Sequence, residues 1–311
     1  MLESVSDQGN LWKKLVDCIN GIVNEANFDC SPGGFSIQAM DASHVALVHM
    51  LLRSDGFSHY QCERNTILGI NLASLTKVLK IIDGGDQLTL RHDEDSDVLQ
   101  IATESKDHSR RCEYQLKLME IEAESMGVPE MEYKSTATLP SSEFAKIVRD
   151  MTVFGDTVTV NVDQEGIRFS STGDIGEGYA FLRAAGTVDT AAKKVAAGSA
   201  GRKPRAVKSE VKQEKDDEDD VTLDRKYPNK AGEGDVKQEP KAVGVEVSID
   251  EPITLSFALR FMTLFAKGAS LSDKVTLHFA QDSPCMVEFD IADVGYLRYY
   301  LAPKVDEGEA Q

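Results

Sequence analysis

The densest group of potentially reactive side chains is an acidic run, Asp216-Asp-Glu-Asp-Asp220. Carboxylates at this density can collect divalent cations, as the metal site of a nuclease does. The run lies in a stretch whose composition predicts disorder, so its carboxylates lack the fixed geometry that catalysis requires. A metal-dependent nuclease is therefore only the weakest alternative.

Other catalytic patterns are missing from the sequence. There is no G-x-S-x-G, phosphate loop, H-E-x-x-H or Rossmann fingerprint, and the glycines of Gly173-Asp-Ile-Gly-Glu-Gly178 have the wrong spacing. Five widely spaced cysteines form no C-x-x-C pair, which favours free thiols in a reducing compartment. The sequence predicts no enzyme, no metal site and no cofactor. The cysteines are Cys18, Cys30, Cys62, Cys112 and Cys285.

Lysine and arginine recur where the sequence has helical spacing. Four segments show that spacing, at 10–19, 72–81, 141–151 and 259–266. If these helices share one side of a sheet, their long basic side chains can contact DNA phosphates without reading bases, which gives salt-sensitive binding. The alternative is that they are ordinary solvated helix faces. The candidate DNA-facing residues are Lys13, Lys14, Lys77, Lys80, Lys146, Arg149, Arg260 and Lys267.

Most of the remaining sequence alternates apolar and polar residues in short runs, such as 87–91, 157–161 and 274–278. This pattern predicts half-buried antiparallel strands joined by tight turns, with hairpins at 31–34 and 163–166. Ser142, after Pro140, is the expected N-cap of the third helix.

The order of predicted elements repeats along the chain. The offset is 132 residues between Lys14 and Lys146 and 187 residues between Lys80 and Lys267. The difference of 55 approaches the length of an Ala-, Gly-, Lys- and Glu-rich stretch at about 184–244, for which we expect disorder. The sequence thus predicts an α+β chain of two similar domains, the second carrying a long insertion.

Charge at first argues against a nucleic-acid partner. The 311 residues contain 34 Lys and Arg against 52 Asp and Glu, a net charge of −18. Residues 190–244 hold 13 basic and 11 acidic residues, a net of +2, which leaves −20 for the rest. Eight cations confined to four helices reverse the argument, because one basic face can coexist with an acidic exterior.

Neither a signal peptide nor an apolar run of about 20 residues is present. We therefore expect a soluble intracellular protein with no membrane partner.

Several long segments resemble the proliferating cell nuclear antigen family, the eukaryotic DNA sliding clamps. The resemblance covers all of the chain except about 184–244. It implies a ring-shaped homotrimer in the nucleus, with antiparallel sheets outside and four helices per chain inside, around duplex DNA. Such a clamp has no catalytic activity; it makes DNA polymerases processive and docks the clamp loader and replication and repair proteins. The matching segments are Ser36-Ile-Gln-Ala-Met-Asp-Ala-Ser-His-Val-Ala-Leu-Val48, Leu52-Arg-Ser-Asp-Gly-Phe57, Asn71-Leu-Ala-Ser-Leu-Thr-Lys-Val-Leu-Lys80 and Leu297-Arg-Tyr-Tyr-Leu-Ala-Pro-Lys304.

The resemblance also divides the chain. The first clamp domain is expected at 1–117, a connecting linker at 118–135, the second clamp domain at 136–301 with the insertion at about 184–244, and a C-terminal tail at 302–311.

Family partners insert an aliphatic and two aromatic side chains into a pocket beside the linker. Methionine and proline surfaces adapt well to aromatic rings. Carried onto this chain, the pocket comprises Met40, His44, Val45, Leu47, Met126, Val128, Pro129, Tyr133, Pro284, Tyr300, Leu301, Ala302 and Pro303.

Family subunits join by edge strands, which would here be 111–117 against 176–182 of another copy. A checkpoint-type clamp subunit that assembles with different chains is the alternative. The expected interface residues are Lys77, Ile81, Tyr114, Leu116, Asp150, Met151, Phe154 and Tyr179.

The sequence departs from the family at sites of modification and charge. Gln164 stands where the family has its usual ubiquitin-acceptor lysine, and Asn20 replaces an inner-face lysine. Within 184–244, three matches to the motif apolar-Lys-x-Glu suggest SUMO attachment at Lys208, Lys212 and Lys237; a charge-balanced solubilising loop is the alternative. Gly201-Arg-Lys-Pro-Arg205 is a low-specificity nuclear-import candidate.

Overall fold

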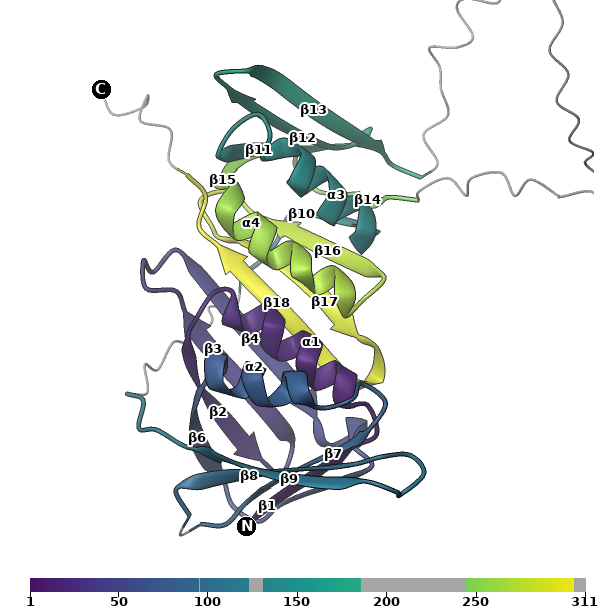
Figure 1. Cartoon of the computed structure of the whole chain (residues 1–311). Helices are drawn as coiled ribbons and strands as arrows, with labels where there is room; N and C mark the ends of the chain where they lie inside the picture. Colours follow the sequence, from purple (N-terminus) through teal and green to yellow (C-terminus); the bar gives the residue numbers. More distant parts are fainter. Residues whose placement is uncertain (95, 123–130, 186–243, 305–311) are drawn as a thin grey trace, which may run out of the picture. The chain divides into compact units, whose positions relative to one another are not determined.

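The computed structural model describes residues 1–94, 96–122, 131–185 and 244–304 (Figure 1). The elements up to the linker are β1 (Leu2–Ser6), α1 (Gly9–Asn20), β2 (Glu25–Ser31), β3 (Gly34–Met40), β4 (Ala46–Arg53), η1 (Ser54–Gly56), β5 (His59–Cys62), β6 (Thr66–Asn71), α2 (Leu72–Ile81), β7 (Gln87–His92), β8 (Val98–Glu104) and β9 (Arg111–Lys117). Those after it are β10 (Ser135–Pro140), α3 (Ser141–Met151), β11 (Thr157–Asp163), β12 (Gly166–Gly173), β13 (Gly176–Arg183), β14 (Glu246–Ile249), β15 (Ile253–Ala258), α4 (Leu259–Phe265), η2 (Ala266–Ser270), β16 (Lys274–Phe279), β17 (Cys285–Ile291), η3 (Ala292–Val294) and β18 (Gly295–Leu301).

The strands pair in the same order twice. The order β5-β1-β7-β8-β9 in the first copy is matched by β14-β10-β16-β17-β18 in the second. Likewise β4-β3-β2-β6 is matched by β13-β12-β11-β15. The described residues therefore form two similar α+β domains, and the two-copy prediction is confirmed.

A single strand pairing joins the two copies into one nine-stranded sheet. β18 of the second copy lies antiparallel to β4 of the first, in a register that runs from Gly295 opposite Leu52 to Leu301 opposite Ala46. The full sheet order is β14-β10-β16-β17-β18-β4-β3-β2-β6. This seam leaves β9 and β13 as terminal strands of the five- and four-stranded sheets.

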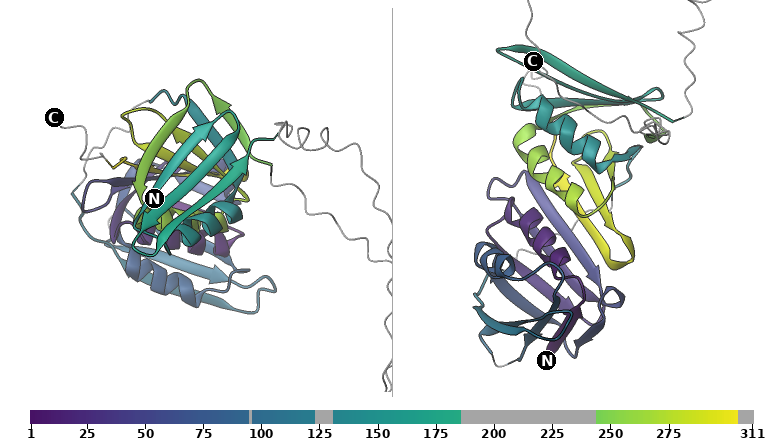
Figure 2. Two further views of the ribbon diagram at one scale, coloured as in Figure 1. Left: turned by 90° about the horizontal axis from the view of Figure 1, so that it is seen from above. Right: turned by 45° about the vertical axis from the view of Figure 1, so that its right-hand side comes forward.

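The helices form one layer on one side of the sheets (Figures 1 and 2). α1 packs beside α2, α3 packs beside α4, and η2 contacts both α1 and α3. The predicted helices agree with the observed ones to within one residue at each end, as the hydrophobic spacing allows. None of the helices in the described ranges is long and apolar enough to span a membrane.

The predicted N-cap of α3 is wrong. Pro140, the last residue of β10, occupies the cap position with extended dihedral angles, and no side chain caps this helix. The strand runs directly into the helix, so Ser142 already lies in the first turn, where it is exposed. α2 has the side-chain cap instead, because Asn71 Oδ1 accepts a hydrogen bond of 2.9 Å from Ser74 N.

Both hairpin predictions are confirmed, and each needs a glycine. In the β2–β3 turn Gly34 has φ +132°, and a Cβ there would lie 1.9 Å from Leu52 O. In the β11–β12 turn Gly166 has φ +154°, while Asp163 Oδ1 accepts hydrogen bonds from the backbone N–H of Glu165 and Gly166. Side-chain bearing residues would be strained at both glycines.

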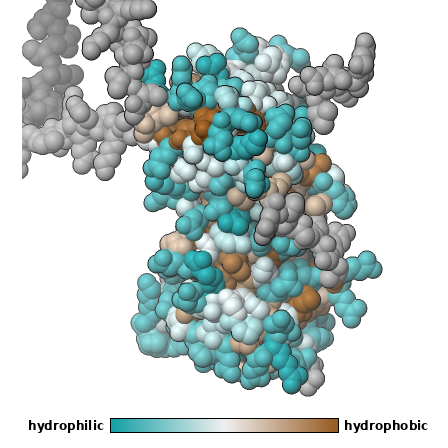
Figure 3. Space-filling view, turned by 180° about the vertical axis from the view of Figure 1, so that it is seen from behind, coloured by the Kyte–Doolittle hydropathy of each residue, from teal (hydrophilic) through white to brown (hydrophobic). Residues whose placement is uncertain are grey.

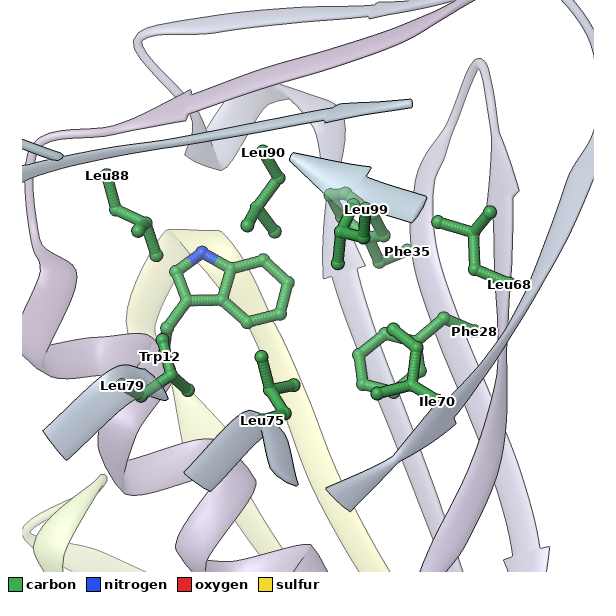
Figure 4. A pocket seen from close by; sticks show the side chains of 10 residues that line it. All are labelled: Trp12, Phe28, Phe35, Leu68, Ile70, Leu75, Leu79, Leu88, Leu90 and Leu99. Atoms are coloured by element: carbon green, nitrogen blue, oxygen red, sulfur yellow. The ribbon is translucent and has the colours of Figure 1, made fainter. Parts of the chain in front are cut away.

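One continuous apolar core runs beneath the helices through both copies. In the first copy Trp12 of α1 meets Phe35 edge-on, with ring centroids 5.3 Å apart. In the second, Phe265 of α4 stacks on Tyr299 at 4.5 Å. A cavity of about 10 Å³ remains around Trp12, and its ten lining side chains are apolar or aromatic (Figure 4). It has hardly room for one water molecule and is too small for a ligand.

Candidate functional site

The eight candidate DNA-facing cations lie on the helical layer. Six of them are exposed, and only Lys13 and Lys14 of α1 are partly buried. Because α1 to α4 occupy one side of the sheets (Figures 1 and 2), their basic side chains belong to a common face. Such a face can meet phosphates through long flexible side chains.

Three of the four candidate cations of the first copy line a surface hollow where α1, α2 and η2 meet. Lys13, Lys14 and Lys80 line it together with Thr76, Leu79, Ser270 and one acidic residue, Asp17. Lys13 Nζ also donates a hydrogen bond to the Ile82 carbonyl. No ion-pair partner for Lys14, Lys77 or Lys80 occurs within the described ranges, so these three ammonium groups are available to an anion.

The cations of the second copy have more contacts of their own. Arg149 Nε lies 3.7 Å from Asp150 Oδ1. The Arg260 guanidinium lies over the Phe261 ring, 4.5 Å from its centroid. Lys146 and Lys267 are exposed. The two copies therefore present similar numbers of cations, but the arginines of the second are already engaged.

The opposite, outer face of the sheets is mostly hydrophilic, with a few separate apolar patches (Figure 3). A cluster of six apolar and aromatic side chains lies at the seam between the copies, and we refer to it as the docking cluster; Leu47, Met286 and Tyr300 are buried (9%, 7% and 8% exposed), and the other three members are partly buried. Its strand residues stand side by side across four strands: Met40 on β3 is opposite Leu47, Leu47 is opposite Tyr300, and Tyr300 is opposite Met286. The docking cluster comprises Met40, Leu47, Met131, Tyr133, Met286 and Tyr300.

Four candidate partner-pocket residues thus meet in the docking cluster, and two members were missed. Met286 could have been found, because it pairs with Tyr300 and alternates with the core residues Cys285 and Val287 along β17. Met131, in the stretch leading to β10, had no period to place it.

The other candidate pocket residues lie around the cluster or elsewhere. His44 is exposed, and Val45, Pro284, Ala302 and Pro303 are partly buried. Leu301 is buried in the main core because it alternates with Tyr300 along β18. Met126, Val128 and Pro129 lie outside the described residues.

The loop between β3 and β4 is built on one carboxylate. Asp41 is only 8% exposed. Its Oδ1 accepts hydrogen bonds from Val45 N (2.8 Å) and Ala46 N (2.6 Å), and its Oδ2 accepts from Ser43 N (2.9 Å) and the Ser43 hydroxyl. Burial alone would raise the pKa of Asp41, but these hydrogen bonds outweigh burial and lower it.

A polar row runs next to the apolar row of the cluster. Arg298 Nε donates to Glu288 Oε2 at 2.8 Å, and its guanidinium lies 3.9 Å from the Tyr296 ring centroid. His49 faces Arg298 across the seam. His278, beside Met286, meets the Tyr133 ring with centroids 5.4 Å apart.

Three polar atoms around the cluster are buried without a hydrogen-bond partner among the described residues: His49 Nδ1, His278 Nε2 and Tyr133 Oη. Burial lowers the pKa of His49, and the nearby Arg298 charge lowers it further. Burial also lowers the pKa of His278, against an opposing effect of Glu288. Burial raises the pKa of the Tyr133 phenol. Both imidazoles are thereby held in the neutral form at neutral pH.

The two strands expected to join subunits are both sheet edges. β9 ends the five-stranded sheet and β13 ends the four-stranded sheet. Near them Ile81 is 64% exposed and Tyr179 is 74% exposed, while Tyr114 and Phe154 are partly buried. Lys77 and Asp150 are exposed. Two further exposed apolar residues, Val153 after α3 and Ile175 before β13, were not predicted.

Two expected interface residues point into the core instead. Leu116 is 8% exposed and Met151 is 4% exposed, and both belong to the main apolar core. They can support the edges from behind, but they offer little surface to another chain.

The remaining candidates lie outside the described residues. These are the acidic run Asp216–Asp220 and the candidate SUMO acceptors Lys208, Lys212 and Lys237. Across the described ranges, no group of three or more His, Cys, Asp or Glu side chains could hold a metal ion. All five cysteines are free thiols, and burial raises the pKa of Cys18 to about 11.

Comparison with known proteins matches this architecture over nearly the whole chain. The family model described as "Proliferating cell nuclear antigen, N-terminal domain" matches residues 1–126. The model of the C-terminal domain of the same family matches residues 127–203 and 231–304. A curated relative, the proliferating cell nuclear antigen of Chaetomium thermophilum, is 37% identical over 309 residues, which are 99% of this chain and 100% of the relative.

Proposed function

The chain belongs to the proliferating cell nuclear antigen family of DNA sliding clamps, and from this membership we propose that three copies close into a ring around duplex DNA. Sliding clamps of this family act in DNA replication and repair. The full-length similarity supports a clamp over a checkpoint-type subunit or a nuclease. The ring would act as a non-enzymatic scaffold in the nucleus.

The observation that carries the proposal is the repeated seam. β9 and β13 occupy the same places in the repeat as β18 and β4, which pair inside the chain. The β18–β4 pairing is therefore a template for pairing β9 with β13 of a second copy. A ring closed in this way would leave neither strand as an open edge.

The repeat also predicts the register of that pairing. Leu116 of β9 and Leu301 of β18 occupy equivalent positions in the two copies. Each is the last core-facing residue of its strand that pairs with the preceding strand, where Leu116 lies opposite Leu99 and Leu301 lies opposite Cys285. Gly178 corresponds to Val48, which lies opposite Tyr299. Transferring the register places Tyr114 opposite Gly178 of the neighbouring copy, a large ring against a residue without a side chain.

DNA contact is proposed for the helical face. Its cations can meet phosphates on either strand without reading bases, so that binding is weak, sequence-independent and sensitive to salt. Enclosure by the ring, rather than affinity, would keep the clamp on DNA. The acidic remainder of the chain, with a charge of −20, would discourage DNA from binding to the outside.

Partner docking is proposed for the docking cluster and the pocket residues around it. DNA polymerases, the clamp loader and repair proteins would insert an aliphatic and two aromatic side chains there. The equivalent outer face of the first copy carries Arg91, Gln100 and Gln115 in place of His278, Met286 and Tyr300. That counterpart is polar, so each chain would offer one docking site rather than two.

Two measurements test the proposed function together. The assembled trimer should have a mass of about 102 kDa by light scattering, three times the chain mass of 34.1 kDa. It should stimulate a polymerase on a closed primed circle, and the stimulation should be lost on linear DNA with open ends. A monomer in solution, or equal stimulation on both templates, would contradict a ring that encloses DNA.

SUMO attachment is proposed at Lys208, Lys212 and Lys237, supported by three apolar-Lys-x-Glu matches within one stretch. Replacing all three lysines with arginine should abolish conjugation in a reconstituted reaction. A matched control replaces Lys193, Lys194 and Lys203, which lack the motif and should leave conjugation unchanged. Undiminished modification of the first variant would refute the assignment.

A further inference from the structure

The loop between β3 and β4 connects two members of the docking cluster. Met40 ends β3, Leu47 is the second residue of β4, and the two stand opposite each other in the sheet. The shape of the intervening residues therefore sets one wall of the cluster. That shape is irregular, because His44 has φ +54°, in the left-handed region that non-glycine residues rarely adopt.

The Asp41 side chain holds this shape through four accepted hydrogen bonds, from the backbone N–H of Ser43, Val45 and Ala46 and from the Ser43 hydroxyl. Its backbone takes part as well. Asp41 N donates to Ala46 O at 2.8 Å, and Asp41 O accepts from His44 N at 2.9 Å. The loop closes on one residue rather than on packing, since Ser43 and His44 are exposed.

The conformation of the 41–46 loop affects the docking cluster in two ways. The His44 ring is presented beside Met40, with Nδ1 3.2 Å from Sδ. The Val45 carbonyl, fixed because Asp41 binds the amides of Val45 and Ala46, accepts a hydrogen bond of 3.1 Å from Ala302 N. Ala302 follows Leu301 at the end of β18, so the same carboxylate also anchors the start of the C-terminal segment where it lies beside the loop.

We propose that Asp41 is a positioning residue for partner docking: it preorganises the 41–46 loop and, through Val45, the adjacent Ala302–Pro303 segment, and thereby shapes the end of the docking cluster at which these two segments meet. The inference rests on the proposed docking function. A surface that is already in its bound shape binds more tightly, because less ordering is required when the partner arrives. Asp41 itself need not touch the partner.

The variants Asp41→Ala and Asp41→Asn test the proposal in the full-length trimer. The probe is a fluorescent peptide with an aliphatic and two aromatic side chains, measured by anisotropy. We expect binding about tenfold weaker for Asp41→Ala. Asp41→Asn should lie between this variant and the wild type, because the amide keeps an acceptor for Val45 and Ala46 but turns a donor toward Ser43 N. Backbone hydrogen exchange should accelerate at Ala46 and Ala302.

A matched control separates positioning from general destabilisation. Asp107, in the β8–β9 hairpin of the five-stranded sheet, accepts comparable hydrogen bonds from Ser109 N and the hydroxyls of Ser105 and Ser109. Asp107→Ala should leave peptide affinity unchanged. Mass by light scattering should stay that of the wild type for every variant.

The outcomes distinguish the proposed docking function from the proposed role of Asp41. Failure of the wild-type trimer to bind the peptide would refute docking at this surface, and with it the role of Asp41. Wild-type binding with unchanged affinity in Asp41→Ala and Asp41→Asn would overturn the role of Asp41 alone. If Asp41→Ala does not fold, the intermediate affinity and local exchange expected of Asp41→Asn still decide the matter.

Discussion

At the scale of single residues, the outer face of the nine-stranded sheet holds two partly buried imidazoles. His49 and His278 lie on either side of the Arg298–Glu288 pair, and one nitrogen of each is buried without a hydrogen-bond partner among the described residues, although His278 Nε2 lies 3.9 Å from Glu288 Oε2. Their pKa values are lowered from 6.5, chiefly by burial. A histidine held neutral in this way links protonation to unfolding.

The change of stability with pH therefore has a definite direction. Below about pH 6.5 the unfolded chain binds protons that the folded chain resists, so stability falls as pH decreases toward about 5. We expect the His49→Gln, His278→Gln double variant to lose less thermal stability than the wild type between about pH 7.5 and 5.5. Calorimetric melting temperatures measure this, with exposed His59→Gln as control. An equally steep loss in the double variant would contradict the linkage.

The limits of sequence reasoning are also clearest at single positions. Met40, Leu47, Tyr133 and Tyr300 were placed in the partner pocket through the family resemblance, and the structure gathers them in one cluster. Leu301 was included with Tyr300, although the two-residue period of a strand sends neighbouring side chains to opposite faces. The hydrogen bonds from Val45 N and Ala46 N to Asp41 depend on the irregular backbone conformation of the loop. Hydrophobic periodicity in the sequence does not predict such a conformation.

At the scale of elements, helix ends show what spacing can and cannot predict. Apolar periodicity located the four α-helices of the described ranges, because each buries one stripe of side chains. It did not identify which residue caps them. Asn71 caps α2, whereas Ser142 lies inside the first turn of α3.

Asn71 and Ser142 therefore make a matched pair for mutation. Asn71→Ala removes the hydrogen bond to Ser74 N and should lower the free energy of unfolding by about 1 kcal/mol. Ser142→Ala removes no cap and should have little effect, within about 0.5 kcal/mol. Denaturant unfolding followed by circular dichroism compares the two. A larger loss for Ser142→Ala than for Asn71→Ala would contradict the cap assignment.

Edge strands make a second prediction at this scale. The transferred register places the Tyr114 ring opposite Gly178 of a neighbour, where a Cβ would already meet the Phe154 ring of its own chain at 2.4 Å. Tyr114→Ala should therefore yield monomers by light scattering, because it removes the ring that would pack against Gly178 and the Phe154 ring beside it. Tyr114→Phe, which keeps the ring, should remain trimeric. A trimeric Tyr114→Ala protein would remove the ring contact from the interface.

At the scale of the whole molecule, the average charge conceals the arrangement that matters. A net charge of −18 argues against DNA until the eight candidate cations are assigned to α1–α4 and to η2, which follows α4. The sequence could predict this partition because helical spacing and residue type are both local. It could not predict that the two copies differ, since the contacts of Arg149 with Asp150 and of Arg260 with Phe261 depend on side-chain placement.

That difference predicts unequal contributions to DNA binding. Lys14, Lys77 and Lys80 have no ion-pair partner within the described ranges, so the triple change to alanine should remove phosphate contacts outright, and each lost contact should make the negative slope of log K against log salt less steep by about 0.9. The matched triple change of Lys146, Arg149 and Arg260 to alanine should reduce the steepness less, because Arg149 and Arg260 already have partners in their own chain. Lys13 is left in place, since its bond to the Ile82 carbonyl supports α1.

Titrations of a short duplex at several salt concentrations compare the two variants, with light scattering to show that both stay trimeric. Equal losses would mean that the arginines give up their intramolecular partners on binding at little cost, and a larger loss for the second triple would place the duplex nearer the second copy.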